Sequence, residues 1–177
     1  YRSELFDEMF RDFWDAPSTL RLFAAVMASR RFRDMRALNY VESFDSAEEK
    51  QFAAVSFQLT DELAYVAFRG TDSTLIGWKE DFNMAFICPV PAQLSAVKYL
   101  ERIAAGTDGA LMLGGHSKGG NLAVYSAAKS SGEIQERIVA VHNNDGPGFA
   151  WDISETPGHK RIASRIHTIL PQTSDDG

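Results

Sequence analysis

The sequence has very little cysteine: Cys88 is the single one among 177 residues. One cysteine excludes an internal disulfide framework and is typical of proteins in a reducing compartment. We therefore expect a cytoplasmic protein in which Cys88, beside Pro89, is a packing residue.

Long apolar runs are also missing. The longest wholly apolar runs, such as Phe23 to Ala28, are far shorter than the roughly 20 residues that a membrane-spanning helix needs. The sequence also lacks the pattern of a secretory signal. It therefore predicts no transmembrane segment.

Basic residues are outnumbered, with 18 Lys and Arg against 24 Asp and Glu, which gives a net charge of −6. The chain therefore has no broad basic surface for nucleic acid or an anionic membrane. Its 45% apolar and 24% charged residues are the balance of a folded protein. The length suits one domain over residues 1–177, which we expect to comprise N-terminal helices (1–35) and a core (36–177).

Hydrophobic periodicity predicts strands that alternate with helices. Helices are predicted over residues 3–14, 18–33, 93–105 and 117–131, and strands over residues 38–45, 51–59, 62–69, 111–114, 137–142 and 165–170. Residues 146–160 are rich in Gly and Pro and are predicted to form a loop. The alternation indicates an α/β fold, a mostly parallel sheet with helices on both faces. Ligands of such sheets bind at the carboxyl ends of the strands.

A GxSxG motif, GHSKG at 115–119, lies between a predicted strand and a predicted helix. A serine at the tip of such a turn has a strained backbone and an exposed hydroxyl, and the helix N-terminus behind it favours a developing oxyanion. Ser117 is therefore a candidate nucleophile. A phosphate-binding glycine loop and a plain turn with a serine cap are the alternatives.

A serine nucleophile also needs two N–H donors for the oxyanion. The amide of Lys118 is one candidate. The second is expected after an earlier strand, and the strand 62–69 is followed by Gly70 and Thr71. The alternative is that Thr71 and Asp72 only cap a short helix that follows.

These motifs resemble a known family. FRGTD at 68–72, followed by Trp78 and Asp81, and GHSKGG at 115–120 strongly resemble the class 3 lipases. The longer strings FRGTDSTLIGWKEDFNMAF and NNDGPGF resemble an uncharacterised bacterial lipase-like family of the α/β-hydrolase superfamily. The resemblance runs from about residue 37 to the end. It implies an α/β-hydrolase fold with Ser117 as nucleophile, Thr71 as oxyanion residue and Lys118 as the second amide.

Lys118 stands where the lipases have leucine, which is the main departure from their pattern. Its ammonium would either bind an anionic head group or leaving group, or pair with Asp145 or Glu80. We expect the pairing.

The resemblance also implies an acid and then a histidine after the nucleophile. Alignment with the lipases favours Asp175 as the acid, with Asp176 beside it, and Asp145 in NNDGPG is the rival. His159 is the candidate base within the chain, although it precedes the last predicted strand. The other possibility is a histidine beyond Gly177, where the final strand and helix of the hydrolase core would also lie. His116, His142 and His167 are explained by packing or geometry.

The sequence therefore predicts a serine hydrolase that acts on small-molecule or lipid carboxylic esters, without a metal or cofactor. An acyltransferase or thioesterase would use the same residues. A non-catalytic module that binds an acylated or apolar ligand is the alternative of a different class. The sequence predicts no oligomeric state.

Overall fold

The computed structural model describes residues 15–45, 47, 50–71, 83–84 and 86–172. It divides the chain into two compact units, Tyr1–Met35 and Arg36–Gly177. This boundary coincides with the predicted end of the N-terminal helices. The single domain expected over residues 1–177 stays a prediction. Within the described ranges, no helix is both long and apolar enough to span a bilayer.

The first unit contains helix α2, Ala16–Ala28. The Asp15 carboxylate caps its first turn by accepting a hydrogen bond from the Ser18 N–H at 3.0 Å. The helix was predicted to continue to residue 33 and ends earlier. The Ser29 hydroxyl accepts a hydrogen bond from the Arg31 N–H at 3.2 Å, a local contact that competes with helical bonding.

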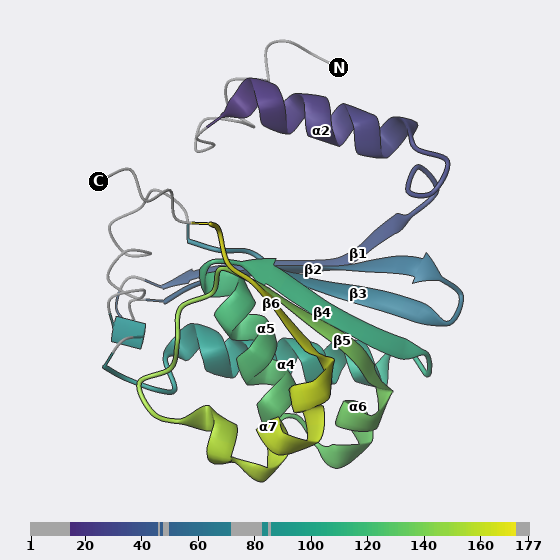
Figure 1. The fold of residues 1–177 in the computed structure, drawn as a ribbon. Helices are drawn as coiled ribbons and strands as arrows, with labels where there is room; N and C mark the ends of the chain where they lie inside the picture. Colours follow the sequence, from purple (N-terminus) through teal and green to yellow (C-terminus); the bar gives the residue numbers. More distant parts are fainter. Residues whose placement is uncertain (1–14, 46, 48–49, 72–82, 85, 173–177) are drawn as a thin grey trace. The chain divides into compact units, whose positions relative to one another are not determined.

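The second unit is built on one six-stranded sheet, whose strands lie side by side in sequence order (Figure 1). The strands are β1 (Arg36–Asp45), β2 (Lys50–Thr60), β3 (Leu63–Phe68), β4 (Ala110–His116), β5 (Ile138–Asn144) and β6 (Ile166–Ile169). β1, β2 and β3 pair antiparallel, whereas β3 to β6 pair parallel. All six correspond to predicted strands, and the predicted α/β fold with a mostly parallel sheet is confirmed.

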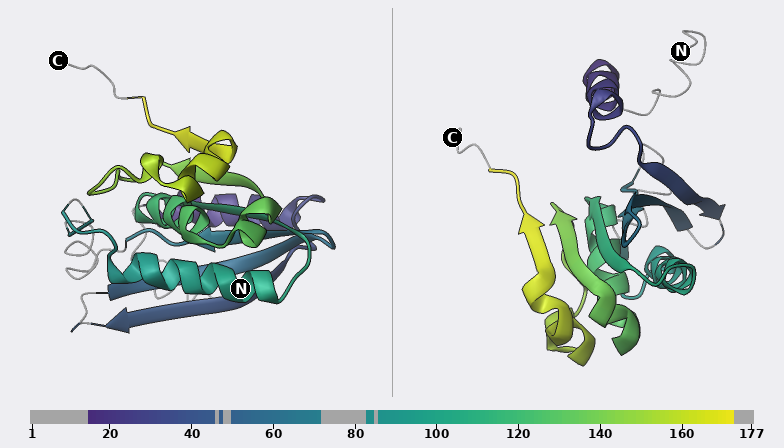
Figure 2. Two further views of the ribbon diagram at one scale, coloured as in Figure 1. Left: turned by 90° about the horizontal axis from the view of Figure 1, so that it is seen from below. Right: turned by 90° about the vertical axis from the view of Figure 1, so that its right-hand side faces the viewer.

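Two long helices connect the parallel strands. α4 (Pro91–Ala105) precedes β4, and α5 (Lys118–Lys129) links β4 to β5. Both lie on the same face of the sheet, in front of it when it is seen from below (Figures 1 and 2). They enclose the core together with the inward side chains of the central strands, such as Val66, Leu111 and Leu113, which are fully buried.

Two short helices were not predicted. α6 (Gly132–Arg137) begins after Ser131, whose hydroxyl accepts a hydrogen bond from the Ile134 N–H at 3.4 Å. Gly132, which directly follows the helix predicted over residues 117–131, is the first residue of α6.

The second short helix begins near the end of residues 146–160, which were predicted to form a loop. This segment contains the 3-10 turn η2 (Ile153–Glu155) and the start of α7 (Pro157–Ile162). A second 3-10 turn, η3 (Ala163–Arg165), then leads into β6. Thr156 caps α7 by accepting a hydrogen bond from the His159 N–H at 3.3 Å. Proline is well tolerated in the first turn of a helix, so Pro157 starts α7 rather than breaking it.

Candidate functional site

Ser117 lies between the end of β4 and the start of α5. Its backbone has φ 55° and ψ −130°, one of three positive φ values at non-glycine residues in the described part of the chain. This backbone conformation is sterically unfavourable for serine. It is kept only where the surrounding structure enforces it. The Ser117 N–H donates to the Asn144 carbonyl oxygen at 2.9 Å, and the Ser117 carbonyl oxygen accepts from the Gly120 N–H at 2.8 Å. This is the strained strand-to-helix turn that the GxSxG motif predicts.

Neighbouring glycines allow the surrounding backbone to approach the turn. A Cβ on Gly119 would lie 2.2 Å from the Phe68 carbonyl oxygen, and one on Gly115 would lie 2.4 Å from the Gly119 carbonyl carbon. On the other side, a Cβ on Gly120 would lie 2.3 Å from Asn143 Oδ1. Carbon atoms do not approach neighbours this closely, so the ends of β3 and β5 pack directly against the turn because these positions have no side chain.

Thr71 follows β3 at the same edge of the sheet. The residue before it, Gly70, contacts the turn: a Cβ there would lie 2.8 Å from the His116 oxygen and 3.7 Å from Ser117 Cβ. Thr71 itself is half-buried. The structure thus brings the chain segment that carries Thr71 next to Ser117.

Lys118 is the first residue of α5, so its amide is one of the helix N–H groups that lack an intrahelical acceptor. Its side chain is only 1% exposed, and Nζ donates to the Gln51 backbone oxygen at 3.0 Å. The ammonium is therefore buried against the backbone of β2. Of the two expected partners, Asp145 has an exposed side chain, and Glu80 lies outside the described residues.

Of the three candidate acids, the structure describes only Asp145. Asp175 and Asp176 lie outside the described residues. Asp145 directly follows β5 with φ 56°, and its N–H donates to the Ile169 oxygen at 2.8 Å. Because the preceding residue accepts the hydrogen bond of the Ser117 N–H, Asp145 lies at the same edge of the sheet as the serine.

His159 is not brought to Ser117. It lies in α7, where a Cβ on Gly158 would be 1.9 Å from the Ala128 oxygen. α7 therefore packs on the last turn of α5. At 1.5 Å per residue, that turn is about 15 Å along the helix from Lys118 and Ser117.

The other three histidines lie in the strands β4, β5 and β6. The rings of His142 and His167 stack across β5 and β6 with their centres 5.4 Å apart. His142 pairs in register with Gly114, three residues before the serine and roughly 10 Å away along the strand. His116 is exposed beside Ser117. Within the described part of the chain, no histidine ring hydrogen-bonds to the Ser117 hydroxyl.

A buried amide network beside the turn was not predicted. Gln93 Nε2 donates to Asn121 Oδ1 at 2.8 Å, and Asn121 Nδ2 donates to the Pro147 and Gly148 oxygens at 3.0 and 3.1 Å. The network fixes the segment after β5 to α5. A sequence signal was present in the asparagine that follows GHSKGG, but its partners are 26 to 28 residues away.

Cys88 joins this network, since its thiol donates to Gln93 Oε1 at 3.3 Å. Burial raises the pKa of the Cys88 thiol, which keeps the thiol protonated and weakly nucleophilic. In the described ranges, no group of three or more His, Cys, Asp or Glu side chains is placed to hold a metal ion. Ser117 is therefore the candidate nucleophile of this edge.

The fold is similar to that of a solved structure. The structure of a fungal lipase in complex with an inhibitor, described as a model for interfacial activation, matches with a TM-score of 0.56. The match has 14% sequence identity and covers 97% of this chain and 73% of that chain. No curated protein matches the chain. The model of the Mbeg1-like family matches residues 26–176, which is most of the sequence, and the chain therefore belongs to the Mbeg1-like family.

Proposed function

We propose that the protein is a serine hydrolase of the α/β-hydrolase superfamily that acts on carboxylic esters. The observation that carries the proposal is the backbone of Ser117, which is held at φ 55° between a parallel strand and a helix N-terminus. A fold shared with a fungal lipase supports this interpretation. Such a fold hosts many functions, so the proposal rests on the site.

In the proposed reaction, Ser117 Oγ attacks the ester carbonyl carbon while its proton passes to a general base. The amides of Thr71 and Lys118 hold the oxygen that becomes negative. The alcohol leaves with the proton, and water then releases the acid from the acyl-enzyme by the same steps. One oxyanion donor typically contributes on the order of 100-fold to 1000-fold in turnover.

For the acid we propose Asp175, with Asp145 as the rival because Asp145 lies at the same edge as Ser117. For the base we propose a histidine beyond Gly177. The positions of His142, His159 and His167, which are held in the sheet or on the far end of α5, favour this over a base within the chain.

A non-catalytic module that binds an acylated or apolar ligand is the second candidate. It is favoured by one observation: in the described ranges no histidine ring hydrogen-bonds to the Ser117 hydroxyl. An acyltransferase or thioesterase would use the same constellation as the hydrolase.

The proposal is tested by intact mass after treatment with a fluorophosphonate, which reacts covalently with activated serines. This chain and the longest natural gene product are compared, each with Ser117→Ala and with the control Ser164→Ala, which replaces an exposed serine in η3. We expect one added label on the longest product and on its Ser164→Ala variant, and none on Ser117→Ala. Label on this chain as well would place the base within residues 1–177.

Absence of label on every form would contradict the hydrolase and favour the binding module. If the label is present, Asp145→Asn and Asp175→Asn are compared by ester turnover, because the true acid should be the one whose loss is larger by orders of magnitude. Product analysis with an added alcohol separates hydrolysis from acyl transfer.

A further inference from the structure

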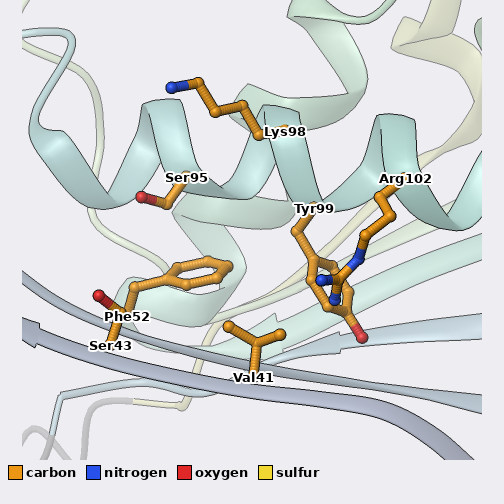
Figure 3. Close-up of a pocket in the computed structure, with 7 residues that line it drawn as sticks. All are labelled: Val41, Ser43, Phe52, Ser95, Lys98, Tyr99 and Arg102. Carbon is orange, nitrogen blue, oxygen red and sulfur yellow. The ribbon is translucent and has the colours of Figure 1, made fainter.

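A pocket lies between α4 and the antiparallel part of the sheet, with a volume of about 280 Å³ (Figure 3). Val41 of β1, Phe52 of β2 and Tyr99 of α4 form apolar walls. Ser43 and Ser95 add two hydroxyl groups. Among the described residues, none that lines this pocket belongs to the Ser117 site.

One wall of this pocket is held rigidly. The Tyr99 hydroxyl donates to the Asn39 oxygen at 2.8 Å. The Tyr99 ring packs edge-on against Phe52, with their centres 6.2 Å apart, and it is 4% exposed. A ring with both a hydrogen bond and an aromatic neighbour is a preorganised surface for an apolar group.

Arg102 provides a cation on this wall. Its guanidinium carbon lies 5.1 Å from the centre of the Tyr99 ring, and Figure 3 shows the two side chains next to each other below α4. Within the part of the chain that the structure describes, Arg102 forms no ion pair and no side-chain hydrogen bond. Its N–H donors are therefore available to a ligand.

The charge of the lining differs from that of the chain. The chain as a whole has a net charge of −6, yet among the described residues the lining includes Lys98 and Arg102 and no carboxylate. Figure 3 shows the Lys98 side chain directed away from the strands, whereas Arg102 points toward them. The local positive charge and the orientation of Arg102 both favour an anion.

We propose that this pocket binds a small carboxylate with an apolar body. The planar guanidinium of Arg102 matches the two oxygens of a carboxylate. The apolar body would lie on Tyr99, Phe52 and Val41. The inference does not depend on Ser117 or on the proposed hydrolysis.

The test is isothermal titration calorimetry with octanoate as the probe, below its micelle concentration. Octan-1-ol, which lacks the charge, and acetate, which lacks the chain, are titrated alongside. We expect octanoate to bind at least about tenfold more tightly than either one. Octan-1-ol keeps only the apolar contacts, and acetate keeps only the contact of its carboxylate with Arg102. No binding of octanoate, or equal binding of all three, would overturn the proposal.

Variants locate the site. Arg102→Gln should weaken octanoate binding roughly 10-fold to 100-fold, since a charge-assisted hydrogen bond is lost. The matched control is Lys98→Gln, one turn earlier on the same helix, which should change binding less than about threefold. Equal losses in the two variants would mean attraction to surface charge only and would overturn the site.

A third variant keeps both cations and fills the pocket. Ser43→Phe should abolish octanoate binding, whereas binding at the Ser117 site would not change. Ser117→Ala should bind octanoate as the unaltered protein does. Unchanged binding in both Arg102→Gln and Ser43→Phe would place octanoate elsewhere and contradict the proposal.

Discussion

At the scale of single residues, Gly119 provides the sharpest test of the turn around Ser117. In Gly119→Ala the new methyl group would lie 2.2 Å from the Phe68 oxygen and 3.0 Å from the Phe68 carbon. Backbone atoms cannot give way as a flexible side chain does, so we expect the free energy of unfolding to fall by about 1–3 kcal/mol or more. Urea unfolding measures this change.

The matched control is Gly132→Ala. A Cβ on Gly132 has no atom within 4 Å, and this residue lies in the first turn of α6. We expect a neutral effect or a gain of about 0.4–1 kcal/mol, because alanine restricts the unfolded chain. Equal losses at both glycines would show that the close packing of β3 on the turn is not what Gly119 provides.

Single residues also show what the sequence can and cannot predict. The position and strain of Ser117 follow from a local pattern, since five residues in a row specify the turn. The burial of the Lys118 side chain does not, because lysine is almost always exposed and its acceptor, the Gln51 oxygen, is 67 residues away. Local patterns also cannot identify a catalytic acid and base that come from distant segments of the chain.

At the scale of secondary structure elements, α4, α5 and the segment after β5 are joined by Gln93 and Asn121. Both side chains are 1% exposed and form a 2.8 Å hydrogen bond with each other. A double-mutant cycle of Gln93→Ala and Asn121→Ala should give a coupling energy of about 0.5–3 kcal/mol. Each single variant should destabilise the fold by about 1–3 kcal/mol, because buried polar partners are left unsatisfied.

The control cycle pairs Asn121→Ala with Gln135→Ala. Gln135 is also 1% exposed, but its amide donates to the Ala127 and Ala128 oxygens at the other end of α5. These two sites share no partner, so their effects should add within about 0.5 kcal/mol. Additivity in the first cycle as well would contradict the network.

Elements with strong periodicity were predicted well, and short capped helices were not. The strand pattern of β3 and β4 is local and was confirmed. α7 was interpreted as a loop because Pro157 and Gly158 resemble turn residues. In the structure Pro157 begins the helix and Gly158 lets it contact Ala128. The role of Gly158 depends on its contact with Ala128, which is 30 residues earlier. Local sequence patterns do not extend over that distance.

At the scale of the whole sheet, burial is concentrated in the middle. In β4, Leu111 and Leu113 are fully buried between two parallel neighbours. The edge strands differ: Tyr40 in β1 and Ile169 in β6 are both 61% exposed. Local stability follows buried apolar contacts and protected hydrogen bonds. The sheet should therefore open from its edges before its centre.

Amide hydrogen exchange followed by mass spectrometry tests this order. We expect peptides from β3, β4 and α5 to exchange slowest and at a common rate set by global unfolding. Peptides from β1 and β6 should exchange about tenfold or more faster, because their opening does not require the core to unfold. β6 is the informative edge, since among the described strands it pairs only with β5. Exchange in β6 as slow as in β4 would contradict an open edge, and it would mean that a further strand or a partner protects Ile166–Ile169 in solution.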